Sequence, residues 1–168
     1  TITLVTVEKF SEAMDKFIAG ECDIVTTDGS ALVGRRAVND ALNDWSIFPT
    51  SPISKEPLGP VYRSNDSMWG DVINWVVYAT IIADEYGVTS ANVDSVDTDA
   101  LPELGRLFGA NDGELQTVMG LSADAFYNVI KQVGNYDEIY SRNLNPVGLF
   151  REGCLLYTSD AADDMASG

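Results

Sequence analysis

The stretch Cys22–Leu32, which reads C-D-I-V-T-T-D-G-S-A-L, predicts a strand followed directly by a helix. Cys22–Thr26 is a short, mostly apolar run with β-branched residues, which is typical of a buried strand. The turn and cap residues Thr27-Asp28-Gly29-Ser30 come next, and Ala31–Asn39 has the composition of a helix. We therefore expect Asp28 at the carboxyl end of a strand, just ahead of a helix N-terminus. In open α/β sheets, ligands bind at that place.

Asp28 has two possible roles at such a position. Backbone N–H groups at a helix N-terminus favour an ionised carboxylate, which suits the binding of a cationic ligand group. Alternatively, Asp28 or Ser30 simply caps the helix, and position alone favours this reading. Gly29 is expected where a Cβ would interfere, either at a positive φ or close to a ligand.

The residues before Cys22 predict a strand and a helix. Thr1–Val7 alternates apolar residues with threonines, which indicates a strand. The next apolar residues share one face of a helix that Gly20 closes: Phe10, Met14, Phe17 and Ile18. A strand–helix–strand order with short links favours a parallel, right-handed βαβ unit. The fold class expected from this pattern is α/β.

A proline-rich stretch follows and indicates a crossing between domains. Trp45–Phe48 reads as a short strand, and Pro49 and Pro52 come directly after it. Leu58–Arg63 is the expected strand on the far side, and Pro60 places it at a sheet edge or a bulge.

The rest of the chain predicts helices. The expected segments are a long helix capped within Ser64–Asp66 and ended by Gly87, a short helix Pro102–Phe108 ended by Gly109, a turn at Asn111–Gly113 with a helical piece to Met119, a helix 122–133 capped by Ser122, and a last helix capped by Asn135. Trp69, Trp75 and Tyr78 could form a ligand cage, but their helical spacing favours core positions.

The acidic segment Thr89–Asp99 offers a calcium loop as an alternative to a solvated, capped turn. Its spacing does not match the D-x-[DN]-x-[DN]-G loop and it lacks the bidentate glutamate, so the capped turn is favoured and no metal site is expected. The apolar run Val72–Ile82 is too short to span a bilayer.

Charge and composition narrow the function classes. The 168 residues carry a net charge of −16 and no histidine, which disfavours nucleic acid as a partner. Without histidine the chain cannot supply Ser-His-Asp or Cys-His chemistry, or a His-ligated metal site. Cys22 is expected to be a small buried hydrophobe, with a disulfide to an upstream cysteine as the alternative.

Four segments together resemble a known family. Gly20–Leu32 resembles the A-G-x-x-D-A-x-x-x-D stretch of family 3 solute-binding proteins of polar amino-acid ABC transporters. Ile53–Arg63 is similar to their return to the first lobe. Trp75–Ala79 and Val129–Ile139 are closer still to the general L-amino-acid-binding subgroup. The resemblance runs from Thr1 to about Gly153.

The resemblance implies part of a two-lobed periplasmic-binding-protein type II fold, truncated at its N-terminus. Residues 1–53 would be the C-terminal part of lobe 2, residues 54–60 the hinge crossing, and residues 61–153 the C-terminal part of lobe 1 with a helical extension. Residues 154–168 are expected to be a non-native tail, because Cys154–Asp163 can be back-translated into a sequence that resembles a transposase sequencing adapter.

The resemblance also implies a transport function. Such a protein captures an L-amino acid in the interlobe cleft and delivers it to the membrane permease. Asp28 would take the ligand's α-ammonium, and Thr27, Gly29 and Ser30 would add nearby contacts. The residues that bind the ligand's carboxylate, and those that select its side chain, would lie upstream. The expectation is an exported, periplasmic protein that is monomeric when full length and uses no cofactor.

Two other functions on the same fold compete with transport. An enzyme similar to cyclohexadienyl dehydratase would need a general-acid glutamate with a raised pKa. Glu56 is the candidate near the hinge, but Lys55 beside it would lower that pKa, so an enzyme is not expected. A ligand-sensing domain of a membrane receptor is the third reading. It is disfavoured because the chain reaches the family's C-terminal region without a linker helix.

Overall fold

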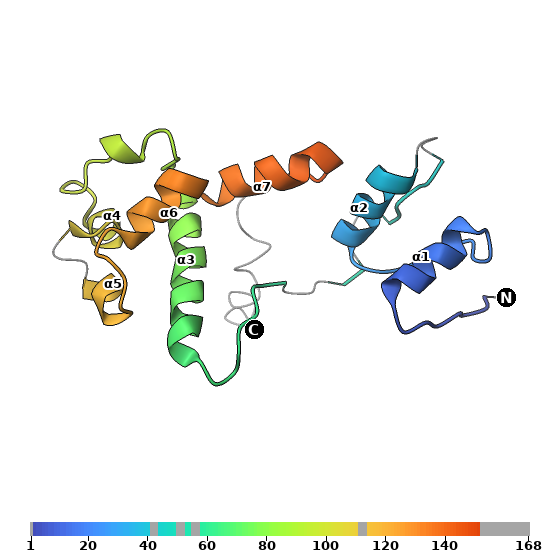
Figure 1. Ribbon diagram of the computed structural model, residues 1–168. Coiled ribbons are helices and arrows are strands. Elements are labelled where there is room, and N and C mark those ends of the chain that lie inside the picture. Colours follow the sequence, from blue (N-terminus) through green and yellow to red (C-terminus); the bar gives the residue numbers. More distant parts are fainter. Residues whose placement is uncertain (1, 41–43, 50–52, 55–57, 111–113, 152–168) are drawn as a thin grey trace, which may run out of the picture. The chain divides into compact units, whose positions relative to one another are not determined.

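The computed structural model describes residues 2–40, 44–49, 53–54, 58–110 and 114–151, and the chain divides into two units, Thr1–Ser54 and Lys55–Gly168. All regular elements in the described residues are helices (Figure 1). The expected turn at 111–113, the tail at 154–168 and residues 55–57 of the expected hinge crossing lie outside the described residues.

The first unit contains two helices, α1 (Phe10–Ile18) and α2 (Gly29–Asn39). The predicted apolar face of α1 is confirmed in part, since Met14 is buried while Ile18 stays half exposed. Gly20 follows α1 with a positive φ, as expected of a residue that closes a helix. On α2, Val33 is buried.

Two aromatic contacts hold the helices of this unit. The guanidinium of Arg35 on α2 lies over the Phe10 ring of α1, 5.6 Å from its centroid. The Phe17 ring of α1 meets the Trp45 ring edge-on at 5.0 Å between centroids. The Arg35 side chain is exposed and still packs on an aromatic ring.

The four predicted strands are not formed in the described part of the chain. Residues 2–7, 22–26, 45–48 and 58–63 carry no β-ladder there. Within the described residues the expected sheet and βαβ unit are therefore not formed, and these stretches are extended segments between helices. A strand is stable only when a neighbouring strand pairs with its backbone groups. No described segment supplies that neighbour, and Ile2 and Leu4 are 95% and 80% exposed.

The second unit is built on the long helix α3 (Ser67–Glu85), which confirms the predicted helix. The Asp66 carboxylate caps it by accepting a hydrogen bond from the Trp69 backbone N–H at 3.1 Å. The chain then leaves the helix at Gly87, which has a positive φ. No helix among the described residues is both long and apolar enough to cross a membrane.

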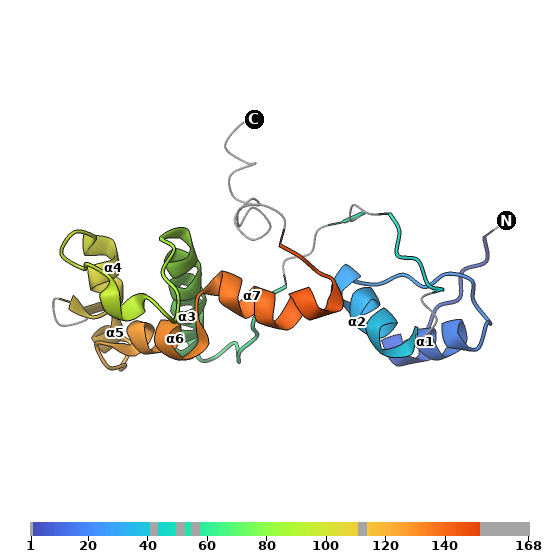
Figure 2. The same ribbon diagram turned by 90° about the horizontal axis from the view of Figure 1, so that it is seen from above.

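The core of this unit lies between α3 and α6 (Ala125–Val133), which are side by side in both ribbon views (Figures 1 and 2). The core residues are Ala79, Ala83, Val88, Val93, Leu104, Leu107, Phe126 and Ile130. Trp75 stacks on Phe126 with centroids 6.5 Å apart, which places it against the core as expected. Trp69 and Tyr78 remain about half exposed, so the expectation of core positions is wrong for these two.

The segment after α3 is a capped turn, as predicted. It contains the 3₁₀ helix η1 (Val93–Ser95), and the Asp97 carboxylate accepts hydrogen bonds from the backbone N–H groups of Asp99 and Ala100. The Asp94 carboxylate accepts bonds from Lys131 at 2.6 Å and from the Tyr127 hydroxyl at 2.5 Å. These two bonds lower the pKa of the Asp94 carboxyl and tie the turn to α6.

Short helices complete the core before α6. They are α4 (Pro102–Leu107) and α5 (Glu114–Val118). Helix α6 begins at Ala125, so Asp124 rather than Ser122 stands at its cap position. The Ser122 carbonyl instead accepts from the Ala125 N–H in the turn ahead of the helix, which delays the start.

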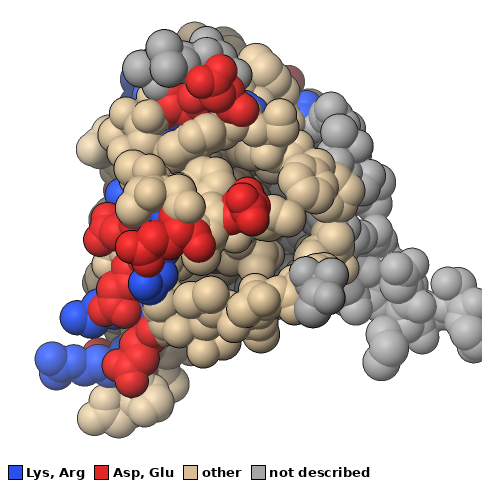
Figure 3. Space-filling view, turned by 90° about the vertical axis from the view of Figure 1, so that its right-hand side faces the viewer, with Lys and Arg blue, Asp and Glu red and all other residues tan. Residues whose placement is uncertain are grey.

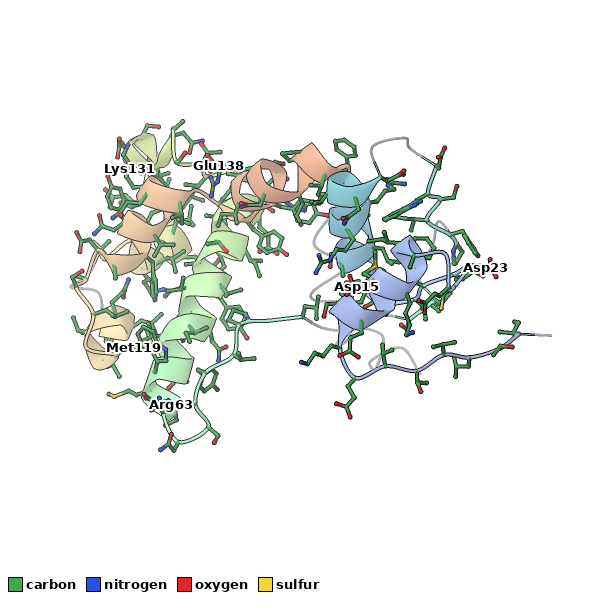
Figure 4. The ribbon with its side chains drawn as sticks, turned by 45° about the vertical axis from the view of Figure 1, so that its right-hand side comes forward. Asp15, Asp23, Arg63, Met119, Lys131 and Glu138 are labelled. Carbon is green, nitrogen blue, oxygen red and sulfur yellow. The ribbon has the colours of Figure 1, made fainter. Side chains whose placement is uncertain are left out.

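The last helices are α7 (Tyr136–Leu144) and the 3₁₀ helix η3 (Asn145–Val147). Asn135 caps α7 as predicted, and Glu138 completes a capping box. The carboxylate of Glu138, which is labelled in Figure 4, also accepts from the Ser90 N–H at 2.9 Å and the Ser90 hydroxyl at 2.6 Å. Desolvation raises the pKa of Glu138, but the hydrogen bonds from Ser90 and Asn135 outweigh it and lower that pKa.

The link between α6 and α7 generates a stability prediction. Gly134 has φ +88° and ψ 178°, and a Cβ there would lie 2.8 Å from the Cβ of Glu138. Gly134→Ala should lower the free energy of unfolding by about 2 kcal/mol or more, since this backbone region is nearly restricted to glycine. Urea denaturation of the whole chain measures the loss.

Gly148→Ala is the matched control for that variant. Gly148 has a similar φ of +85° in the ordinary left-handed region, with nothing within 4 Å of its Cβ position. Gly148→Ala should lower the free energy of unfolding by about 1 kcal/mol, which is the strain of a non-glycine residue in the left-handed region. Equal losses for the two variants would show that the contact with Glu138 does not matter.

Candidate functional site

The candidate site is the junction Thr27–Ser30 at the start of α2. Asp28 stands at the N-cap with φ −54° and ψ 139°, and its carbonyl accepts the first helical hydrogen bond from the Leu32 N–H at 3.0 Å. The extended segment that precedes it includes Asp23 (Figure 4). The structure therefore places Asp28 immediately before a helix, as the sequence predicts.

The Asp28 side chain is exposed and makes no cap hydrogen bond. The simple capping role is thus not what the geometry shows. No other acidic residue lies in the first turn of α2, so this carboxylate is the local complement to the positive end of the helix dipole. An exposed, anionic oxygen pair beside free helical N–H groups can accept hydrogen bonds from a cationic group.

The neighbours of Asp28 have different surroundings. Thr27 is half-buried and Ser30 is exposed on the first turn of α2. Gly29 has ordinary helical backbone angles, with no atom within 4 Å of a Cβ built there. The prediction that a Cβ at Gly29 would interfere within this chain is therefore wrong. The reason is that α2 begins at Gly29, two residues earlier than predicted, so Gly29 is its first helical residue.

The other candidate groups do not form a second site. Cys22 has a free, half-buried thiol, so it is less buried than expected. No cluster of three His, Cys, Asp or Glu side chains suited to a metal occurs in the part of the chain that the structure describes. The face in Figure 3 carries acidic side chains with basic ones among them along one side. Glu56, the candidate general acid, is outside the described residues.

No protein-family model matches the chain. Individual proteins do match it, and they are named as amino-acid-binding proteins or as binding proteins of amino-acid ABC transporters. The chain is 42% identical over 141 residues to the general L-amino acid-binding periplasmic protein AapJ of Rhizobium johnstonii, covering 83% of this chain and 41% of that protein. It is 41% identical over 155 residues to the glutamate/glutamine/aspartate/asparagine-binding protein BztA of Rhodobacter capsulatus, covering 90% and 45%.

Two further matches agree. A putative amino-acid ABC transporter-binding protein of Escherichia coli, YhdW, is 37% identical over 143 residues, covering 84% of this chain and 41% of that protein. A solved periplasmic binding protein of an ABC transporter from Brucella ovis, with glutathione bound, superposes with a TM-score of 0.77 at 39% identity. That match covers 89% of this chain and 46% of the other.

The resemblance expected from the sequence is therefore confirmed. Over the matched residues the chain is a homologue of periplasmic amino-acid-binding proteins of ABC transporters. It spans less than half the length of these relatives.

The missing cap bond at Asp28 can be tested by amide hydrogen exchange. Asp28→Ala in the whole chain should leave exchange in the first turn of α2 within about twofold of wild type, because no cap bond is lost. Asp66→Ala is the matched control, since its carboxylate does cap a helix. There the Trp69 amide should exchange about fivefold faster, the equivalent of roughly 1 kcal/mol of cap energy. Faster exchange throughout the first turn in Asp28→Ala would restore the capping role.

Proposed function

We propose that the chain is part of the substrate-binding component of an amino-acid ABC transporter, which captures an L-amino acid and delivers it to a membrane permease. The observation that carries the proposal is 42% identity over 141 residues to a general L-amino acid-binding periplasmic protein. Two other relatives are named for amino-acid binding or transport. A periplasmic location for the whole protein follows from the same relatives.

The proposed organisation is two lobes that close on the ligand by a hinge motion. Residues 1–53 would contribute to lobe 2, residues 54–60 to the crossing, and residues 61–153 to lobe 1. The exposed apolar segments support this assignment. Ile2, Leu4 and Ile24 lie in extended, largely exposed backbone, which is what strands show when their sheet neighbours are absent. In the whole protein these segments would pair within a sheet.

Asp28 is the residue that we propose takes the ligand's α-ammonium group. Its exposed carboxylate at the start of α2 supports this role, because it is not engaged in a cap. A charge-assisted hydrogen bond from an ammonium N–H to a carboxylate is about twice as strong as a neutral one. Thr27 and Ser30 would contribute hydroxyl or backbone contacts, and Gly29 would let a ligand approach the helix start without a side chain in the way.

A γ-glutamyl peptide is a second ligand class worth testing. The solved relative from Brucella ovis holds glutathione, whose glutamyl end carries the same free α-ammonium and α-carboxylate as an amino acid. The enzyme and sensor alternatives have no comparable support, because the relatives are named as binding proteins of transporters.

The chain by itself should not bind amino acids measurably. It spans 41% of the Rhizobium relative, so most of a two-lobed cleft, including the proposed carboxylate clamp, is not supplied by these residues. Isothermal titration of residues 1–168 with glutamate, glutamine, leucine and glutathione should give a Kd above about 1 mM, weaker than roughly 4 kcal/mol. Micromolar binding of any of them would contradict this view of the site.

The role of Asp28 requires a complete cleft, which a chimera can provide. In it, this chain replaces the matching segment of the Rhizobium protein. Asp28→Ala should weaken amino-acid binding by roughly a hundredfold to several thousandfold. Closure leaves the ligand's ammonium buried without its partner, at a cost of about 3–5 kcal/mol. Isothermal titration of the chimera and its variant measures the change.

Asp28→Asn is the control that separates charge from shape. It keeps an acceptor oxygen but loses the negative charge, so ammonium recognition predicts a large loss of affinity. The melting temperature of the unliganded chimera should change little. If the Asn variant binds amino acids as tightly as the unmodified chimera, Asp28 is not the ammonium partner.

A further inference from the structure

The Tyr62 ring lies where a Cβ of Gly70 would be. A Cβ built on Gly70 would come within 2.4 Å of Cζ, 2.6 Å of Cε2 and 2.7 Å of the hydroxyl oxygen of Tyr62. Gly70 is on the first turns of α3, and it is buried although the residues around it are exposed. A single Cβ at this position is incompatible with the ring where it stands.

The segment that Tyr62 belongs to has little else to hold it. Residues 58–63 begin just after the division between the units at Ser54 and Lys55, and they lead into α3. Leu58 and Val61 are 73% and 93% exposed, whereas Tyr62 is 44% exposed. A backbone hydrogen bond lies at the far end of the segment, where the Arg63 carbonyl accepts from the Asp66 N–H at 3.1 Å.

We infer that the Tyr62–Gly70 contact is an anchor that fixes the end of the segment 58–63 to the first turns of α3. The Tyr62 ring packs on the helix backbone at Gly70 and buries apolar surface there. The other side chains of residues 58–63 are exposed. Gly70 is kept free of a side chain for this purpose, although glycine inside a helix costs helical stability. The inference rests on this contact and does not need the proposed function.

Gly70→Ala tests the anchor because its methyl group fills the space that the Tyr62 ring occupies, while the helix α3 is kept. The atoms that a Cβ would meet are the far end of a side chain, so the ring swings away while α3 remains intact. Alanine is also the better helix former. Backbone ¹⁵N relaxation of the whole chain should give order parameters of about 0.85 for Tyr62 and Arg63 in the wild type. They should fall below about 0.6 in Gly70→Ala.

Four further variants make the test specific. Tyr62→Ala should release the segment to the same extent, and Gly70→Ala in that background should have no added effect. Tyr62→Phe retains the ring and should stay rigid. Gly34→Ala is the control for alanine in a helix, because Gly34 lies in α2 with nothing within 4 Å of its Cβ position. It should leave Tyr62 and Arg63 unchanged.

The outcomes decide the inference in either direction. Low order parameters at Tyr62 and Arg63 in the wild type would overturn it, as would an unchanged segment in Gly70→Ala. It also fails if the two substitutions release the segment additively, because the glycine would then act through some contact other than Tyr62. A shared, non-additive release with a rigid Tyr62→Phe variant supports the anchor.

Discussion

The packing of α6 against the small side chains of α3 is the contact on which the second unit depends. Ala79 and Ala83 are fully buried on α3, and Phe126 and Ile130 are fully buried on α6. Small residues on one helix let large residues of the other approach its backbone, which is how a close helix pair reaches interior packing density. The turn after α3 and the helix α4 then close the remaining sides with Val88, Leu104 and Leu107.

Polar contacts arrange the rest of this unit around that helix pair. Asn135 is buried and donates from its side-chain amide to the Val88 carbonyl, and Glu138 holds both polar groups of Ser90. Arg151 pairs with Asp84 at 2.6 Å and with Asp137 at 3.1 Å, which connects the end of α3 with the start of α7. Each contact joins residues distant in sequence, so the direction of α7 is set by hydrogen bonds to a turn rather than by its own apolar face.

In the first unit, few side chains are buried and several apolar ones are exposed. Its two helices bury Met14 and Val33, and its extended segments place Ile2, Leu4 and Ile24 in the open. The candidate site lies in this unit, at the junction that precedes α2. The proposed ligand contacts at this junction would need further residues to complete a cleft, and the relatives are more than twice as long as their matched segments. Both the small number of buried residues and the proposed half-site are consistent with a chain that spans less than half the length of its relatives.

The sequence by itself predicted the helices, several of their ends and the resemblance to the relatives. Gly87 and Gly134 end helices, and Asp66 and Asn135 cap them, because these signals act within a few residues and need no distant partner. It also placed Asp28 directly ahead of α2. Those features are local, so one chain carries all the information they require.

Only the tertiary structure decided the rest. The predicted strands are extended but unpaired, because a strand needs a neighbour that sequence periodicity does not supply. The direction of the Asp28 side chain decided that it does not cap α2. The exact start of α2 decided that Gly29 has ordinary helical angles and open space around it. The contact of Tyr62 with Gly70 was not predicted, although a glycine inside a predicted helix was its signal. Its partner is in a different segment, so the reason for that glycine became visible only in three dimensions.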